Sequence, residues 1–218
     1  PAWYQREIEI PAAWKGKRIF LYFERTHWLS SVYVGKEEVS KIDYISIPHN
    51  HELTQWLHPG KKELITFCID NRYQYDTHKW DHAHSEFTQI NWNGVLGEIK
   101  LVAVDPVYVD DMQVYPDIKN KSIKVKMTVR NCTEHTASGK ISFHVTGKDY
   151  RLQKEVPVTV TDSITYIEEE MFLGKDIHLW NEFHPNLYTL DCKLTERVDG
   201  QSYAHEKSTT FGMREVEA

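Results

Sequence analysis

Hydrophobic and polar residues alternate along most of this chain. Residues 123–130 read Ile-Lys-Val-Lys-Met-Thr-Val-Arg, which puts the apolar side chains on one face of an extended segment. The same period of two recurs in residues 140–146 and 187–196. Because successive side chains of a strand point to opposite faces, each segment predicts a half-buried β-strand. Residues 18–24 and 63–70 are apolar on both faces, which is typical of strands covered on both sides.

Turn residues separate these segments. They lie at Lys15-Gly16, 58–60, Ser138-Gly139, 147–149 and Asp199-Gly200. Short strands at this spacing predict an all-β protein made of β-sandwiches, with a single helical turn at residues 51–57. We place a boundary at Asp105-Pro106. Residues 1–105 are predicted to form a jelly-roll-like sandwich, and residues 106–218 an immunoglobulin-like sandwich of about seven strands.

Composition and charge narrow the classes of partner. The chain has 218 residues, 40% of them hydrophobic and 27% charged, which is typical of a soluble globular protein. The net charge is −6 without a long run of either sign, so we predict neither a nucleic-acid nor an anionic-membrane partner. No apolar run approaches the ~20 residues of a membrane span, and residues 1–10 carry no signal-peptide pattern.

Three cysteines lie far apart in strand-like contexts. They are Cys68, Cys132 and Cys192. An odd number in apolar surroundings favours buried free thiols over a disulfide framework. The alternative is a bridge from Cys132 to Cys192 between strands of the second sandwich.

Three further segments carry a more specific signature. Residues 88–101 contain Trp-Asn-Gly before a predicted strand, residues 179–190 contain Leu-Trp-Asn-Glu and Pro-Asn-Leu-Tyr, and residues 208–218 contain Phe-Gly-Met-Arg-Glu. In this order and spacing they resemble the accessory sandwich domains of glycoside hydrolase family 2, which includes β-galactosidases, β-glucuronidases and β-mannosidases. The resemblance covers nearly the whole chain. In such sandwiches, a tyrosine at the position of Tyr188 ties its hydroxyl back to the backbone.

The resemblance implies a non-catalytic N-terminal portion of such a hydrolase. The family's two catalytic glutamates lie on a (β/α)8 barrel, so this chain is expected to contain no catalytic residue and to be inactive alone. Asn181-Glu182 is similar to the family's acid/base pair, but it lies inside the sandwich signature. The implied partners are carbohydrate, bound weakly in isolation, and the missing barrel of the same polypeptide. A bacterial polysaccharide-degrading parent would be periplasmic or secreted.

The resemblance also implies that the first domain is incomplete. Family members carry several tens of residues before the segment similar to residues 6–11. We therefore expect an uncovered edge or core face near residues 3–10 or residues 19–23, and homo-oligomers that form through it. The alternative function is a free-standing carbohydrate-binding or adhesion module of two sandwiches.

Residues 72–94 form a long, polar and aromatic segment, of a length that is often functional in loops. In the sugar-binding interpretation Trp80 or Trp92 stacks on a sugar, while Asp81, His82 or Asn91 bonds its hydroxyls. A weaker metal interpretation uses His82 and His84 with nearby carboxylates. The third possibility is a surface loop that packs its aromatic rings on protein. We predict no metal and no cofactor. Family members often have an Asp where this chain has Thr88, so that contact is not expected here.

Overall fold

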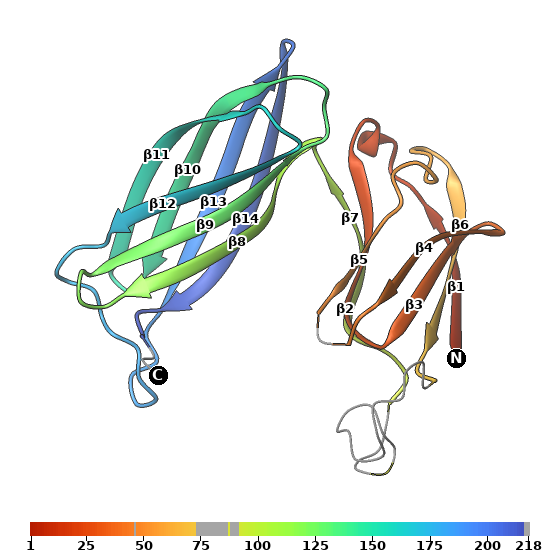
Figure 1. Ribbon diagram of the computed structural model, residues 1–218, viewed down its shortest axis with the longest axis horizontal. Helices are drawn as coiled ribbons and strands as arrows, with labels where there is room; N and C mark the ends of the chain where they lie inside the picture. Colours follow the sequence, from red (N-terminus) through yellow and green to blue (C-terminus); the bar gives the residue numbers. More distant parts are fainter. Residues whose placement is uncertain (46, 73–86, 88–91, 216–218) are drawn as a thin grey trace. The chain divides into compact units, whose positions relative to one another are not determined.

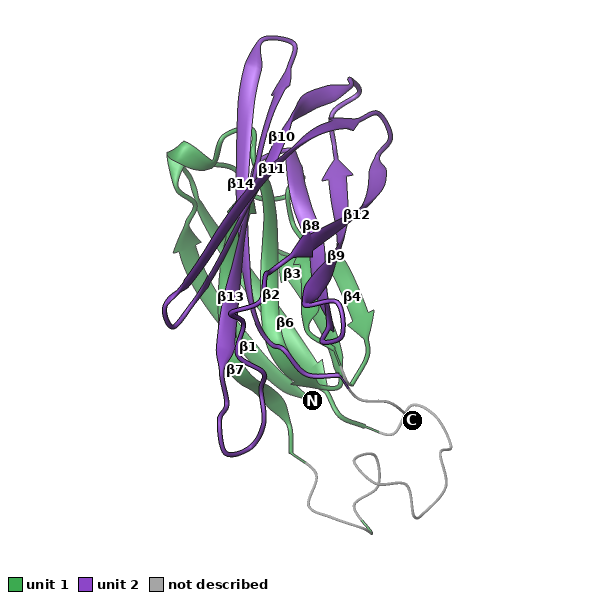
Figure 2. Cartoon of the chain, turned by 90° about the vertical axis from the view of Figure 1, so that its left-hand side faces the viewer, with its two compact units in different colours: residues 1–103 green, residues 104–218 purple. Residues whose placement is uncertain are grey.

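The computed structural model describes residues 1–45, 47–72, 87 and 92–215. Within them, strands dominate and one short 3-10 helix, η1 (Ala12–Trp14), is present. The chain divides into two compact units, residues 1–103 and 104–218 (Figures 1 and 2). The predicted all-β sandwich architecture is confirmed. No helix in the described part of the chain is long and apolar enough to cross a membrane.

The first unit packs a four-stranded sheet against a three-stranded one. The sheet orders are β1-β6-β3-β4 and β5-β2-β7. The strands are β1 (Ala2–Glu9), β2 (Arg18–His27), β3 (Leu29–Val34), β4 (Glu37–Asp43), β5 (His49–Glu52), β6 (Lys62–Asp70) and β7 (Gly94–Val104). Alternate residues of β2 fill the core, where Ile19, Leu21 and Phe23 are 3% exposed or less. One helical turn follows β5, as predicted, because the amides of Trp56 and Leu57 both bond the carbonyl of Leu53.

The second unit also consists of two packed sheets. Their orders are β11-β10-β13-β14 and β12-β9-β8, and every pairing in them is antiparallel. The strands are β8 (Val107–Asp117), β9 (Ser122–Asn131), β10 (Ala137–Gly147), β11 (Tyr150–Val160), β12 (Ile164–Phe172), β13 (Leu187–Val198) and β14 (Gln201–Gly212). The predicted alternation is confirmed in β9, β10 and β13, whose inward residues form the core. Burial of these side chains is the main stabilising term for such a sandwich.

A tyrosine closes one corner of this unit. Tyr188 is 3% exposed, and its hydroxyl accepts a bond of 2.7 Å from the amide of His178 and lies 3.3 Å from the carbonyl of the same residue. The ring packs against Phe211 of the neighbouring strand, with the centroids 5.6 Å apart. The predicted tie between the Tyr188 hydroxyl and the backbone is confirmed.

Two local predictions were wrong. Ser138-Gly139 lies inside β10 and is not a turn. Glycine is needed there because a Cβ at position 139 would lie 1.9 Å from the carbonyl oxygen of Thr195 on β13. Cys132 is exposed because β9 ends at Asn131 and the chain turns there. None of the three cysteines forms a disulfide, so the alternative bridge between Cys132 and Cys192 does not form.

The core of the second unit holds one isolated carboxylate. Glu196 occupies an inward position of β13 and is 3% exposed, opposite Gly139 and Tyr203. Neither of its oxygens has a hydrogen-bond partner among the described residues. Burial alone raises the pKa of Glu196 to about 7, because a charged carboxylate is poorly solvated there.

Glu196 should make the second unit less stable as the pH rises. The folded state keeps a proton that the unfolded state, with a pKa near 4.5, has lost, so the free energy of unfolding falls between about pH 5 and pH 8. In Glu196→Gln this fall in the free energy of unfolding, on the order of 2 kcal/mol, should be absent. Urea unfolding of both proteins at pH 5.5 and 8.5 measures the difference.

The matched control is Glu206→Gln, which changes an exposed carboxylate on the adjacent strand. That residue is paired with Lys193, which lowers the pKa of Glu206 by hydrogen bonding. Its variant should keep the pH dependence of the parent. If the Glu196 variant also keeps it, the carboxyl is ionised in the folded unit and our interpretation of the buried site is wrong.

Candidate functional site

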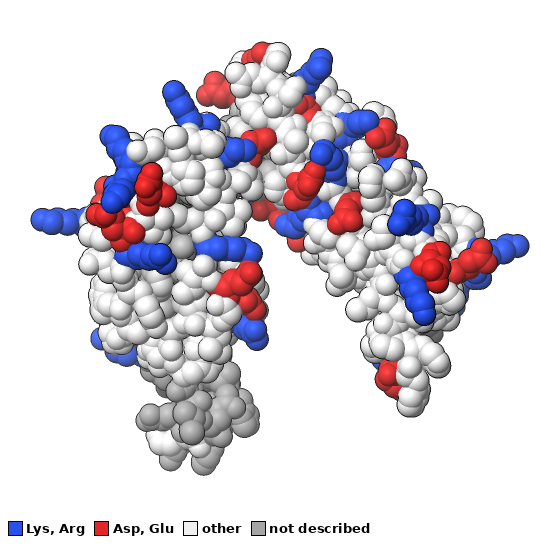
Figure 3. Space-filling model, turned by 180° about the vertical axis from the view of Figure 1, so that it is seen from behind, with Lys and Arg blue, Asp and Glu red and all other residues white. Residues whose placement is uncertain are grey.

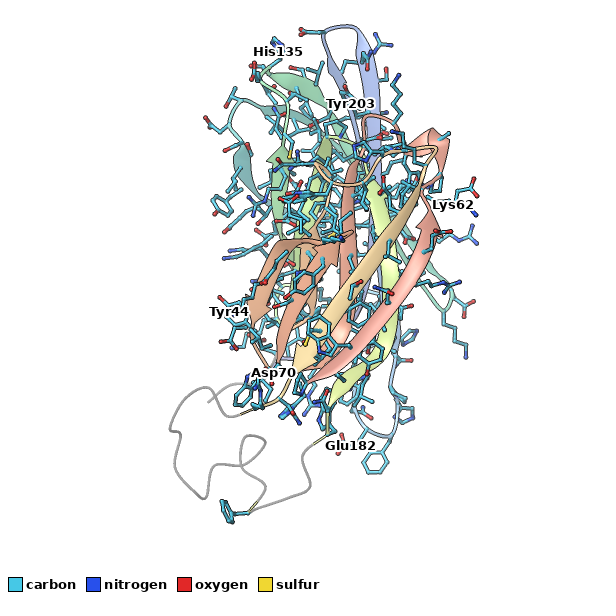
Figure 4. The ribbon with its side chains drawn as sticks, turned by 90° about the vertical axis from the view of Figure 1, so that its right-hand side faces the viewer. Tyr44, Lys62, Asp70, His135, Glu182 and Tyr203 are labelled. Carbon is cyan, nitrogen blue, oxygen red and sulfur yellow. The ribbon has the colours of Figure 1, made fainter. Side chains whose placement is uncertain are left out.

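Most of the predicted sugar-binding residues lie outside the described residues. These are Trp80, Asp81, His82 and Asn91, together with the metal candidate His84 and the family-related position Thr88. Trp92 is described. We therefore describe the candidate site from the residues at the end of the first unit where β6 stops and β7 starts. Figure 4 shows Asp70 at that end of β6, with Lys62 at the other.

An aspartate and an arginine fix the end of β6. Asp70 is 7% exposed, and its carboxylate accepts two bonds of 3.0 Å from Arg72 Nε and one of 2.6 Å from Nη2. The backbone amide of Arg72 donates a further bond of 2.9 Å. These bonds to the Arg72 side chain lower the pKa of Asp70, so it stays ionised. The arginine side chain is 70% exposed.

An asparagine joins the two sides of the segment that follows. Asn71 Nδ2 donates to the backbone carbonyl of Trp92, 3.2 Å away. The half-buried ring of Trp92 lies 5.1 Å from that of His27, the last residue of β2. Trp92 therefore packs against its own sandwich while part of its surface reaches solvent. Nearby, Gly94 has a φ of 106°, and a Cβ there would lie 2.5 Å from the hydroxyl of Tyr4.

A chain of buried hydrogen bonds supports this end of the unit. His49 Nε2 lies 2.9 Å from the carbonyl oxygen of Tyr44, which can only accept, so Nε2 carries the proton. His49 Nδ1 then accepts from Ser30 Oγ, 2.6 Å away. Ser30 Oγ accepts from His51 Nε2, and His51 Nδ1 accepts from Ser40 Oγ, both over 2.8 Å. One carbonyl thus sets the direction of every bond in the chain.

This series of hydrogen bonds is structural and not catalytic. Ser30, His49 and His51 are all 0% exposed, so no substrate reaches the serine hydroxyl. Burial lowers the pKa of His49 and lowers that of His51 to about 3, which keeps both rings neutral. The sequence signal for this cluster is a pair of histidines two residues apart on a short strand, which puts both rings on one face. We did not predict it from the sequence.

A second candidate region unites two of the sequence motifs. The amide of Trp180 donates to the carbonyl of Met213, 3.1 Å away, and the guanidinium of Arg214 lies 4.7 Å from the centre of the Trp180 ring. Gly212 permits this approach, because a Cβ there would lie 2.9 Å from atoms of the tryptophan side chain. The Leu-Trp and Phe-Gly-Met-Arg motifs therefore meet in space and hold the segment before β13 against the end of β14.

The Asn-Glu pair in this segment forms a turn. Asn181 Oδ1 accepts bonds of 3.0 Å and 2.8 Å from the amides of Phe183 and His184, which makes the turn tight. Glu182 is exposed at that turn. A shallow hollow beside it is lined by Lys148, Asp149, His178, Leu179, Asn181, His184 and Asn186. Leu179, Phe183 and Leu187 expose 49%, 83% and 56% of their surface, and we call these three residues the apolar loop surface.

Neither a patch of one charge nor a cluster of metal ligands marks either candidate region among the described residues. Figure 3 shows Lys and Arg interspersed with Asp and Glu on the displayed face of both units. Within residues 1–45, 47–72, 87 and 92–215, no group of three or more His, Cys, Asp or Glu side chains is placed to hold a metal ion.

Comparison with known proteins finds similarity to glycoside hydrolases. Residues 107–214 match the family model described as glycosyl hydrolases family 2. A β-galactosidase of Thermoanaerobacter pseudethanolicus is 22% identical over 195 residues, which cover 88% of this chain and 26% of that protein. A putative β-glucuronidase of Formosa agariphila is 24% identical over 220 residues, 98% of this chain and 19% of the relative.

Solved structures show the same fold. A putative β-galactosidase from Bacteroides fragilis superposes with a TM-score of 0.79 at 18% identity, over 99% of this chain and 33% of that one. A β-glucuronidase from Bacteroides uniformis has a TM-score of 0.77 at 16% identity, over 96% of this chain and 26% of its own. The chain spans between about a fifth and a quarter of the length of the curated relatives named above. The predicted resemblance to glycosyl hydrolases family 2 is confirmed, by the match of residues 107–214 to the family model and by the similarity of nearly the whole chain to these relatives.

Proposed function

We propose that this chain is a non-catalytic portion of a family 2 glycoside hydrolase that positions the catalytic domain. The observation that carries the proposal is the extent of the similarity, which covers 88% and 98% of this chain but 26% and 19% of the two relatives. Neither Glu196 nor Glu182 suits a catalytic role, since Glu196 is buried in a core and Glu182 lies in an exposed turn. Retaining hydrolysis needs two carboxyl groups about 5 Å apart on either side of the scissile bond.

The apolar loop surface is our candidate for the contact with the catalytic domain. Three large apolar side chains that are about half to four-fifths exposed suggest an interface, because water is a poor environment for such a group. The segment that carries them is held by the Trp180 contacts to Met213 and Arg214 and by the Tyr188 hydroxyl. A pre-ordered surface binds with a smaller entropic cost than a flexible one.

The second part of the proposal is that the Asp70 end of the first unit borders the sugar pocket of the complete enzyme. Trp92 offers part of a ring for stacking, and the exposed guanidinium of Arg72 offers N–H donors for hydroxyl groups. Without the walls of a pocket, these two groups would bind a sugar only weakly. The catalytic domain and a carbohydrate are therefore the proposed partners, and a periplasmic or secreted location would follow from a polysaccharide substrate.

The chain of residues 1–218 alone should hydrolyse no glycoside. The reason is that the resemblance puts the two carboxylates that supply the acid and the nucleophile on the family's catalytic barrel. Release of nitrophenol from a panel of aryl β-galactosides, β-glucuronides and β-mannosides measures it. Turnover that disappears in Glu182→Gln would contradict the proposal, because it would place the chemistry in this chain.

Phe183→Ser should weaken docking of the chain to a separately produced catalytic domain of the parent enzyme. Loss of a central apolar anchor commonly raises a dissociation constant by about tenfold or more. Calorimetric titration of one part with the other gives the constants. Tyr166→Ser is the control, since Tyr166 is 79% exposed on β12 and belongs to neither candidate region. Equal effects of the two changes, or none from Phe183→Ser, would show that the apolar loop surface is not the interface.

A further inference from the structure

Strands β8 and β14 lie side by side in the second unit, although they belong to different sheets (Figure 1). Each is the last strand of its own sheet, and among the described residues no backbone ladder joins the two. Hydrogen bonds that involve side chains connect residues 105–110 with residues 204–207 instead, and we call this contact the seam. At its start, Asp105 Oδ2 accepts a bond of 3.0 Å from the amide of Ala204.

A bulge in β8 allows the rest of the seam to form. Successive residues of a regular strand direct their backbone polar groups to opposite sides. The register of β8 with β9 shifts between Val109 and Asp111, so Asp110 is an extra residue. The amide of Val109 and the carbonyl of Asp110 therefore both reach β14. His205 Nδ1 accepts from that amide over 3.2 Å, and Lys207 Nζ donates to that carbonyl.

His205 can make its bond only while Nδ1 has no proton. A backbone amide can only donate, so Nδ1 must present its lone pair to Val109, and the proton of the neutral ring lies on Nε2. A second proton, on Nδ1, would set two donors against each other. The amide of Val109, a residue that is 1% exposed, would then lose this acceptor, which is costly for a buried group. Histidine is the side chain that ordinarily gains a proton near neutral pH.

Charged and titratable groups of both signs surround the half-buried ring of His205. They are Asp105 before β8, Tyr108 and Asp110 on β8, Arg130 on β9, Glu196 on β13, and Glu206 and Lys207 on β14. Burial raises the pKa of Glu196 to about 7, so this carboxyl is mostly neutral below about pH 6. The remaining acids and bases act on a charge at the ring in opposite directions. The bond from Val109 is thus the feature that distinguishes the neutral from the charged ring.

The seam holds the segment by which the chain enters the second unit. Residues 105–110 follow directly on the boundary between the units at residues 103 and 104. We propose that His205 is a pH-sensitive latch on the seam, whose neutral ring binds β8 to β14 and whose protonation at Nδ1 releases β8. Release leaves β8 paired with β9 alone. The proposal does not depend on the proposed function.

Exchange of the Val109 amide with solvent measures the state of the latch. In the 1–218 chain its protection factor, which corrects for the intrinsic effect of pH on exchange, should fall by about fivefold or more from about pH 7.5 to about pH 5. The amide of Met127, at the centre of β9, is the internal reference and should show no such fall. Protonation of Glu196 stabilises the folded unit over the same range, so its effect has the opposite sign.

Two substitutions of His205 separate the bond from its titration. His205→Asn keeps an oxygen acceptor close to the position of Nδ1 that does not gain a proton, so the protection of Val109 should be equal at the two pH values. His205→Leu has no acceptor, and protection should be low at both. The matched control is His144→Asn, which changes an exposed histidine on the outer face of β10 and should keep the response of the parent.

Three results would overturn the proposal. One is a parent protein in which the protection of Val109 is the same at both pH values. Another is a fall that persists in His205→Asn or disappears in His144→Asn, since either would assign the response to a different group. The third comes from the nitrogen chemical shifts of the His205 ring at about pH 7.5, which need no substitution. They should show the proton on Nε2, and a proton on Nδ1 would contradict the latch.

Discussion

Burial of one face of each sheet against the other is the constraint on which both units depend. Apolar and polar side chains alternate in β9, β10 and β13 because inward positions face the core and outward positions face solvent. The polar exceptions show how strict the constraint is. His49 and His51 are buried only within a chain of bonds in which every ring nitrogen has a partner. Glu196 has no such partner among the described residues, and its burial raises its pKa to about 7, so a large share of it is the neutral acid near pH 7.

The segment between β12 and β13 of the second unit is ordered by its contacts with the end of β14. The segment between β12 and β13 has no strand of its own beyond the single bridge between Trp180 and Pro185. It is ordered by contacts with residues 212–214 and by the Tyr188 hydroxyl. The exposed side chains of Leu179 and Phe183 therefore project from a fixed support. This arrangement suits a surface whose proposed task is to hold a neighbouring domain.

Local patterns predicted much of this fold. The strands with clean alternation, the turn at Asp199-Gly200 and the Tyr188 corner were all readable, because each depends on residues close together in sequence. Gly139 was misread as a turn residue because its reason is the backbone of β13, more than fifty residues away. The exposure of Cys132 depends on where β9 ends, and strand boundaries are the least certain part of such a prediction.

The candidate site was less readable than the fold. The sequence singled out residues 72–94 by composition, whereas the structure describes only the base of that segment, formed by Asp70, Asn71, Arg72 and Trp92. The serine–histidine chain beneath it joins three strands that are separate in sequence, so no local pattern predicted it. The meeting of Trp180 with Arg214 is likewise non-local, although both residues belong to motifs that the sequence had marked.

The central claim is that the segment with the apolar loop surface is ordered before any partner binds. Amide hydrogen exchange of the isolated chain tests it most directly, at the amides of His178 and Trp180. The account predicts that both exchange slowly, with protection close to that of amides in β13, because each is bonded to a fixed acceptor. Exchange at the rate of an unstructured peptide, while β13 stays protected, would show that the segment is mobile and would contradict the account.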